Sequence, residues 1–402
     1  MRITTKALNR SMLHVIHNRF DDMARIQERL STGKRLLRPS DHPVDVANAL
    51  KLTSKQKELL QFKNNINDGL GFMAVTDSAM ESMNTLLQKS RELAIQGSSD
   101  TLNESERIFI NKETEQLFRQ MLSLLSTQYK GDYIFSGAQT KMPPFLIEDS
   151  SADSVDDYNN LKMAYFNTDG MPTGSTAQIF NGFDNTAITN IIPGSFKLFV
   201  AGTEYVENRD YSIDYEAGTI TILNTDLALD VTPGSVNYDI NQVQMEFDYV
   251  TKGKNIYGEV ASNRGEVYRE IEFGISMQIN ISGDELITDS VSGNDLIGTM
   301  IRFGQNLLQN NRSGIQSAIE QIDTVFNNIL SSQSKNGARI NRFETTLDRN
   351  EGQYIDIESL RSELEDAEYA ETITQFMLTQ NIYTAALQSA AKIIQPSLVN
   401  FL

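Results

Sequence analysis

The sequence predicts a mainly α-helical protein with an inserted β domain, whose N- and C-terminal helices pair in a long helical rod or coiled coil. Apolar residues follow a three-four spacing along both ends of the chain, which places an apolar seam on one side of each helix. The eight prolines avoid residues 45–142 and 234–395, so both stretches can form long helices. Between them, short β-branched runs predict a small antiparallel β domain at the far end of the rod.

The two apolar seams are the predicted assembly interface, because a seam of this kind requires a partner helix. A seam of this spacing can also belong to an internal core, which is the more common case in helical proteins. The interface residues are Leu13, Ile16, Phe20, Met23 and Leu30 near the start, and Ile373, Phe376, Tyr383, Leu387 and Ile394 near the finish.

Charge agrees with pairing of the two ends. Residues 1–38 hold nine Lys/Arg and three Asp/Glu, whereas residues 351–402 hold two Lys/Arg and eight Asp/Glu. The middle segment, 141–250, holds 17 Asp/Glu against four Lys/Arg, which indicates a solvated acidic surface. The net charge of −18 argues against nucleic acid as a partner.

The C-terminal segment carries the strongest sign of assembly. From Thr372 to Leu402 the only charged side chain is Lys392, and Thr, Gln, Asn and Ser fill the polar positions. An exposed helix of a monomer normally carries many charges, while a helix buried among identical neighbours avoids unpaired ones. We therefore expect the termini to be poorly ordered in the monomer and to fold on assembly.

Local signals define the predicted elements. Asn103 is a candidate helix cap, and Gly33 and Gly97 are candidate stops. Met73, Met80, Met83 and Met121 occupy core spacing and are expected to be packing residues. The predicted helices cover about 4–30, 44–96, 103–129, 315–350 and 352–395, and the predicted strands cover 195–200, 203–206, 211–215, 219–223, 236–240 and a long alternating run at 271–281 that we expect to pair with 132–136.

These elements divide into three predicted domains. A terminal coiled-coil domain comprises 1–45 with 368–402, and a helical rod domain comprises 46–140 with 258–367 and includes a β-hairpin or strand element. An acidic β-rich inserted domain covers 141–257. No stretch approaches the roughly 20 apolar residues of a membrane-spanning helix, so we expect no membrane partner.

The sequence predicts no enzyme and no cofactor. The absence of Cys excludes thiolate nucleophiles, disulfides and Cys-based zinc sites. His14, His17 and Asp21 share one helical face, but that spacing is common by chance, so we predict no metal site. Gly69 and Gly71 lack the third glycine and the preceding strand of a dinucleotide site.

Two motif groups resemble the flagellin superfamily. The run Leu-Ser-Thr-Gly-Lys-Arg-Leu at 30–36, followed by Pro-Ser-Asp-His-Pro at 39–43, resembles its N-terminal signature. Residues 337–344, 365–371 and the ending 390–402 resemble its C-terminal motifs. The motif positions are Gly33, Arg35, Pro39, Asp41, Pro43, Arg339, Asn341, Asp366, Tyr369 and Ala370.

The resemblance implies a structural component of the bacterial flagellum. The loop at 39–43 and the ending Leu-Val-Asn-Phe-Leu resemble the hook–filament junction branch more than flagellins. That branch implies a homo-oligomeric ring between a hook-side junction protein and flagellin. It also implies a cytoplasmic chaperone and export through the flagellar type III system, without a cleaved signal peptide, to the extracellular flagellum. The alternatives are a flagellin, or a secreted adhesin or enzyme with its activity in 141–257.

Overall fold

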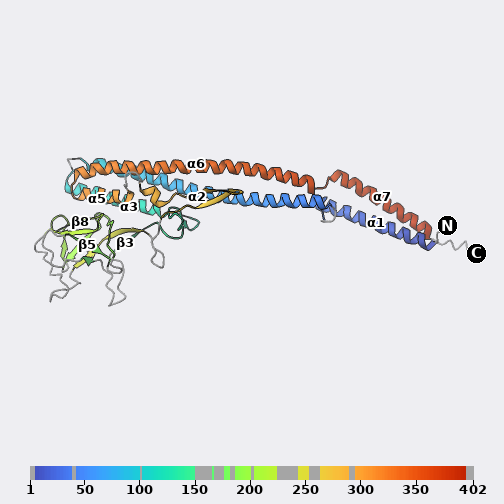
Figure 1. The fold of residues 1–402 in the computed structure, drawn as a ribbon, viewed down its shortest axis with the longest axis horizontal. Helices are drawn as coiled ribbons and strands as arrows, with labels where there is room; N and C mark the ends of the chain where they lie inside the picture. The colour runs from blue at the N-terminus through green and yellow to red at the C-terminus, as the bar shows by residue number, and fades with distance from the viewer. Residues whose placement is uncertain are drawn as a thin grey trace, which may run out of the picture. The chain divides into compact units, whose positions relative to one another are not determined.

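The computed structural model describes residues 5–38, 42–99, 102–149, 165–166, 176–181, 186–200, 203–223, 243–252, 263–288 and 295–394. The chain forms two compact units. The terminal unit comprises Met1–Asn64 with Thr346–Leu402, and the central unit comprises Asn65–Thr345. Long helices dominate and the sheets are small and antiparallel, which confirms the predicted fold class (Figure 1).

The helices of the described chain agree with the periodicity of the sequence. They are α1 (Thr5–Thr32), α2 (Pro43–Gly97), α3 (Glu104–Leu125), α4 (Gly283–Ile287), α5 (Leu296–Leu308), α6 (Arg312–Glu365) and α7 (Tyr369–Ile394). The predicted cap of α3 is confirmed, because the Asn103 side chain accepts a hydrogen bond from the Glu106 backbone while the Glu106 carboxylate accepts one from the Asn103 backbone.

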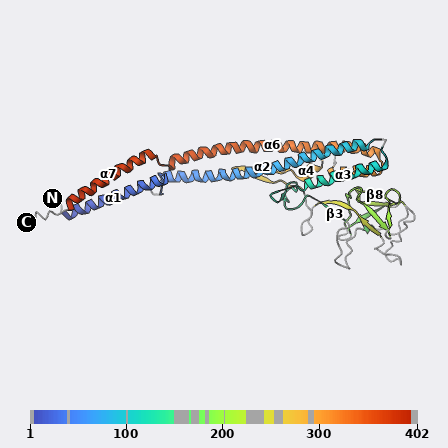
Figure 2. The same cartoon turned by 180° about the vertical axis from the view of Figure 1, so that it is seen from behind.

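In the terminal unit, α1 and α7 lie side by side in both views of the fold (Figures 1 and 2). The first part of α2 and the last part of α6 also contact each other there, and Lys63 Nζ lies 2.8 Å from a Glu351 carboxylate oxygen. Few side chains of this unit are buried, and those in the described residues are Ala49, Gln56, Leu59, Phe62, Thr346, Asn350, Thr372 and Ala390.

The central unit has a dense core between α2, α3, α5 and α6. The four methionines expected to be packing residues, Met73, Met80, Met83 and Met121, are fully buried there, which confirms that expectation. They pack in the same core as apolar residues spaced by heptads on α6, from Ile315 to Ile329. Buried Asn336 donates a hydrogen bond of 2.9 Å to the Met73 carbonyl and so ties α6 to α2.

The break in the C-terminal helices was predicted in the wrong place. The sequence analysis separates two helices near residue 351, but α6 continues without interruption to Glu365. Gly352 lies within α6, and a Cβ atom there would meet open space, so this glycine marks no turn. The helix ends instead at 366–368, where the backbone bonds to residues from the start of the chain.

The inserted β domain contains short antiparallel strands. Its sheets follow the orders β4-β5-β9-β8, β10-β6-β7 and β11-β3. Four predicted strands are confirmed as β6, β7, β8 and β9, whereas the predicted strand at 236–240 lies outside the described residues. The strands are β3 (Phe145–Asp149), β4 (Tyr165–Phe166), β5 (Thr176–Phe180), β6 (Lys197–Val200), β7 (Thr203–Tyr205), β8 (Tyr211–Asp214), β9 (Thr219–Ile222), β10 (Val243–Glu246) and β11 (Asp248–Lys252).

The long alternating run at 271–281 is a hairpin and not one strand. β12 (Tyr268–Glu272) pairs with β13 (Ile275–Gln278) across a turn at Phe273 and Gly274, where Gly274 has φ +72°. The predicted pairing with 132–136 is wrong, because β2 (Asp132–Tyr133) pairs with β1 (Gln128–Tyr129). Alternation shows which face of a strand is buried, but it does not show where a strand reverses direction.

Polar contacts attach the β domain to α3 and α5 within the central unit. The Asn111 side-chain amide, on α3, donates a hydrogen bond of 3.2 Å to the Pro193 carbonyl. Arg119, also on α3, pairs with Asp248 at the start of β11. On α5, a guanidinium nitrogen of Arg302 pairs with Glu216, which follows β8. The β domain is therefore held by one face of the helical core.

No helix in the described part of the chain is both long enough and apolar enough to span a bilayer.

A partly unsatisfied carboxylate lies inside the β domain. Glu207 accepts a hydrogen bond of 2.7 Å from the Tyr215 hydroxyl through one oxygen, whereas its other oxygen is buried without a hydrogen-bond partner among the described residues. Burial raises the pKa of Glu207 above the ordinary value, and it also raises the pKa of Tyr215. A carboxyl whose pKa is raised on folding stabilises the fold at low pH and loses that contribution as the pH rises through its folded pKa.

We predict that the β domain is less stable at neutral pH than at the ordinary glutamate pKa of 4.5. Glu207→Gln should remove this part of the pH dependence and stabilise the domain at neutral pH by about 1 kcal/mol, because it replaces a charged buried group with a neutral one. Urea unfolding followed by near-ultraviolet circular dichroism at several pH values measures both effects. Glu246→Gln, at an exposed position of β10, is the control, and an unchanged pH profile in Glu207→Gln would contradict the prediction.

Candidate assembly interface

The helix pair α1–α7 carries the predicted seam. Three seam residues of α1 (Ile16, Met23 and Leu30) and two of α7 (Phe376 and Tyr383) are half-buried. The rings of Phe20 and Tyr383 meet with their centroids 6.2 Å apart. The structure therefore places the two ends of the chain side by side, with Phe20 of α1 against Tyr383 of α7.

Much of the apolar surface of this pair is exposed. Leu13, Phe20, Ile373 and Leu387 all belong to the predicted interface and remain exposed in the single chain. Two helices side by side can cover only one stripe of each other, so residues on either edge of the seam stay in water. Ile394 is the last residue of α7, and its side chain lies outside the described residues.

Further exposed apolar residues extend the surface beyond the predicted seam. On α1 and α7 they are Val15, Tyr369, Met377, Leu378 and Ile382, and on the terminal parts of α2 and α6 they are Val44, Leu50, Leu60, Ile355 and Leu360. The terminal unit contains 14 of the 25 exposed large apolar side chains of the described chain. Exposed apolar patches of this kind mark interaction surfaces.

A shallow groove lies between α2 and α6 in the terminal unit. Lys63 and Glu351 pair across it at 2.8 Å, and its remaining lining is mostly apolar or aromatic. The lining residues are Leu59, Leu60, Lys63, Asn350, Glu351, Tyr354 and Ile355. The α2 residues of this groove show no clear apolar seam in the sequence, because lysines at 51, 55, 57 and 63 interrupt the apolar spacing.

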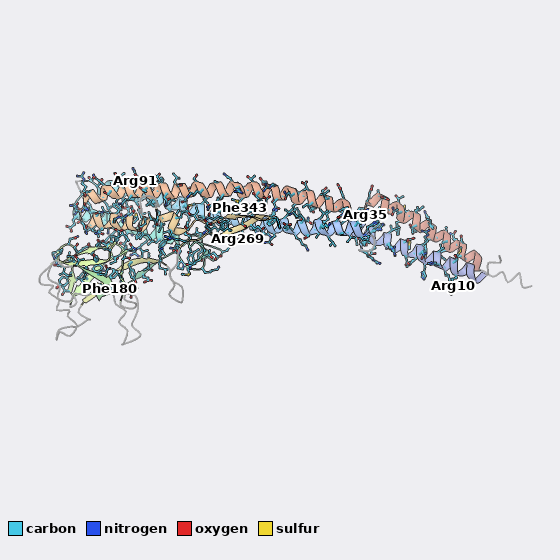
Figure 3. All side chains as sticks on the ribbon, in the orientation of Figure 1. Arg10, Arg35, Arg91, Phe180, Arg269 and Phe343 are labelled. Carbon is cyan, nitrogen blue, oxygen red and sulfur yellow. The ribbon has the colours of Figure 1, made fainter. Side chains whose placement is uncertain are left out.

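A backbone clasp joins the two connections of the terminal unit, and we define it as residues 33–35 with 365–367 (Figure 3, near the label Arg35). The Arg35 amide donates a hydrogen bond of 2.6 Å to the Glu365 carbonyl, and the Ala367 amide donates one of 2.8 Å to the Gly33 carbonyl. Lys34 and Asp366 form an antiparallel bridge between them. The clasp thus unites N-terminal and C-terminal motif residues that are more than 300 positions apart.

Side chains reinforce the clasp. Lys34 Nζ lies 2.8 Å from a Glu365 carboxylate oxygen, and the Arg35 guanidinium donates to the Leu364 carbonyl and pairs with Asp45. Gly33 has φ +67°, a conformation that favours glycine, and a Cβ there would lie 3.0 Å from the Tyr369 hydroxyl. Periodicity in the sequence does not predict the hydrogen bonds of the clasp, because they join backbone groups.

The remaining motif residues have separate positions. Arg339, on α6, donates 2.7 Å and 2.9 Å hydrogen bonds to the Gln278 side chain and the Asn280 carbonyl, so it holds the base of the β12–β13 hairpin. Pro43 is the first residue of α2, where a missing amide proton costs nothing. Asn341 and Ala370 are exposed. Pro39 and Asp41 lie outside the described residues.

An ion-pair cluster holds the same hairpin against α2. Asp68 accepts hydrogen bonds from Lys130, at 2.7 Å, and from Arg269, at 3.1 Å (Figure 3 labels Arg269). The hydrogen bond from Lys130 is the largest cause that lowers the pKa of Asp68. The Asn65 amide donates to the Glu270 carbonyl beside it. These contacts belong to the central unit and explain why the hairpin is fixed at its base.

The residues considered for a metal site or a dinucleotide site do not come together in such a site. His14, His17 and Asp21 are exposed on α1. Across the part of the chain that the structure describes, no group of three His, Asp or Glu side chains could hold a metal ion. Gly69 and Gly71 lie inside α2, where a Cβ at Gly69 would meet the Phe343 ring and one at Gly71 the Tyr129 hydroxyl. These glycines allow close packing of the central unit.

Fold and interface together define a helical structural subunit with an inserted β domain and an apolar surface at its terminal helices. The family of the bacterial flagellin N-terminal helical region matches residues 3–140. This match agrees with the resemblance to the flagellin superfamily that the motifs of the sequence indicate.

Individual relatives are distant. Flagellin E of Vibrio cholerae is 25% identical over 388 residues, which cover 93% of this chain and 92% of that protein. Flagellar hook-associated protein 3 of Escherichia coli is 28% identical over 149 residues, which cover 37% of this chain and 47% of that protein. A solved structure of flagellar hook-associated protein 3 from Legionella pneumophila is 16% identical, with a TM-score of 0.39 over 78% of this chain and 98% of that one.

We predict that protease cuts the free protein first before about residue 45 and after about residue 368, because the terminal unit has few buried side chains to resist local opening. Limited digestion with a protease of broad specificity, followed by mass spectrometry, measures this order. Trypsin is unsuitable because α7 contains no Lys or Arg before Lys392. We expect cleavage at the ends to be about tenfold faster than within Asn65–Thr345. Equal rates in both units would contradict the prediction.

Proposed function

We propose that the protein is the subunit of the junction between the flagellar hook and the filament, in the manner of a flagellar hook-associated protein 3. The observation that carries the proposal is the terminal unit, which exposes 14 large apolar side chains and buries very few. A surface of this kind is completed by other molecules, because one chain cannot cover it. In a ring of identical subunits, neighbouring copies bury the same apolar surface on every subunit.

Assembly energy in this proposal comes from lateral packing of the terminal helices. Burying one large apolar side chain contributes about 1.5–3 kcal/mol, so a few residues on each copy are sufficient to hold a ring. Because the stretch Thr372–Ala391 is uncharged, α7 can be buried without burying an unpaired charge. The acidic β domain is attached to α3 and α5 of the central unit.

The proposed partners follow from this role. One face of the ring meets a hook-side junction protein and the other meets flagellin, for whose polymerisation the ring is the adaptor. The subunit is exported unfolded through the flagellar type III channel with the help of a cytoplasmic chaperone, and it works outside the cell. The absence of cysteine suits export of an unfolded chain, since no disulfide can form on the way.

A flagellin is the second candidate, because Flagellin E of Vibrio cholerae aligns along nearly the whole chain. The two roles differ in one property, since flagellin elongates without limit and a junction subunit does not. Purified protein added to filament seeds and imaged by electron microscopy separates them. Growth of long filaments would overturn the junction proposal. In the cell, a strain that lacks the gene should shed flagellin monomers and regain filaments when the gene is restored.

The third candidate, an adhesin or enzyme on a flagellin-like frame, places its activity in 141–257. Removing 141–257 and finding motility intact would show that this domain is an accessory surface. We propose no catalytic, cofactor or metal role, since no nucleophile–base arrangement supports one.

We predict that Leu387→Asp abolishes filament attachment, because a charge placed on the apolar surface of α7 has no partner when neighbouring subunits cover it. Leu223→Asp is a matched control, since Leu223 in the β domain is 42% exposed and Leu387 is 41% exposed. Swimming assays and micrographs of complemented deletion strains measure the effect, which should reduce attached filaments about tenfold or more for Leu387→Asp alone. Normal motility with Leu387→Asp, or equal loss with the control, would show that the assignment of α7 is wrong.

A further inference from the structure

The seam between α1 and α7 does not by itself select one alignment of the two helices. In the structure the Phe20 ring contacts the Tyr383 ring. Seven residues earlier on α7 is another aromatic residue, Phe376. A slip of one heptad, about 10 Å along the axis, would replace one aromatic contact by another and keep the apolar seam apolar.

Charge does not select the alignment either. No ion pair or side-chain hydrogen bond joins α1 to α7 among the side chains that the structure describes on these helices. From Thr372 to Ala391 the sequence has no charged residue. Paired helices often fix their register through polar or charged contacts, and the described side chains form none between these two helices. The opposite charges of the two chain ends meet at the clasp instead, in the pair Lys34–Glu365.

The clasp has the specificity that the seam lacks. Two backbone hydrogen bonds, from Arg35 to Glu365 and from Ala367 to Gly33, fix individual residues against each other at the point where α1 ends and α7 begins. A shift of one residue would break both bonds and would separate Lys34 from Glu365. Gly33 has φ +67° and lies close to the Tyr369 hydroxyl, since a Cβ atom at residue 33 would be 3.0 Å from it.

We propose that the clasp, and not the apolar seam, sets the register in which α1 pairs with α7. Gly33, Arg35, Glu365 and Ala367 are then positioning residues for the terminal helix pair. The seam supplies most of the contact area, and the clasp selects which heptads meet. This inference concerns a single chain and does not depend on the proposed role in the flagellum.

Disulfide trapping tests the inference directly, because the protein has no cysteine and each introduced thiol is unique. The native pair is Phe20→Cys with Tyr383→Cys, and the slipped pair is Phe20→Cys with Phe376→Cys. Each is made in the intact chain and in two chains with a damaged clasp. Ala367→Pro removes the amide that donates to Gly33, and Gly33→Val places a β-branched residue at positive φ. The monomer fraction of each is oxidised at high dilution, and the yield of intramolecular disulfide is measured.

In the intact chain we expect the native pair to form about tenfold more disulfide than the slipped pair, which is the selectivity that two backbone hydrogen bonds and an ion pair can supply. In both damaged chains the ratio should fall towards one. Gly352→Val is the matched control, since it introduces valine at a helical glycine of α6 with open space around it and should keep the ratio.

Two results would overturn the inference. One is equal trapping of both pairs in the intact chain, which would mean that the clasp selects no register. The other is an unchanged preference for the native pair in Ala367→Pro and Gly33→Val, which would mean that the helices align without the clasp. Circular dichroism of each variant establishes that the helices are present, and the milder Lys34→Ala, which removes the ion pair with Glu365, replaces any variant that loses its helical signal.

Discussion

Two helices that lie side by side can bury only one stripe of each other, and this limit governs the terminal unit. α1 and α7 carry apolar residues on more than one face, from Leu13 to Leu387, so the pair leaves part of its apolar surface in water. The central unit escapes the limit because α2, α3, α5 and α6 surround a common core of methionines, isoleucines and phenylalanines. One chain therefore contains a unit with a closed apolar core and a unit that leaves apolar side chains in water.

In the terminal unit, polar groups and apolar groups make contacts at different places. Charged residues at the ends of the chain pair at the clasp, as Lys34 does with Glu365, and not across the helix seam. A charge in the seam would have to lose its water whenever a neighbouring molecule covered the helices, which is costly unless the charge is paired. Backbone hydrogen bonds at the clasp carry no such cost, since they are already satisfied in the single chain. On the proposal that the clasp sets the register, the exposed surface of α1 and α7 can remain apolar while the two helices stay aligned.

The sequence was sufficient for the features that repeat. Proline-free stretches and heptads located the long helices and the seam, and Asn103 located one helix start, because each of these signals is local. It failed where the chain reverses or bonds at a distance. The alternation at 271–281 concealed a turn at Gly274, and the break predicted near residue 351 is absent from α6. The hydrogen bonds of the clasp could not be predicted, since they join backbone groups that precede and follow the whole central unit in the sequence. Its residues were found only as motif positions.

The β domain and the terminal helices can differ in surface charge because they are held by separate contacts. It is attached by contacts to Asn111, Arg119 and Arg302 on α3 and α5, and these helices belong to the central unit. The interface residues of α1 and α7 belong to the terminal unit. A change in the acidic surface of the β domain therefore alters no residue of the seam or of the clasp. The contacts that attach the β domain and the contacts between α1 and α7 share no side chain. The inserted domain can therefore carry a net negative charge while α7 stays almost free of charged residues.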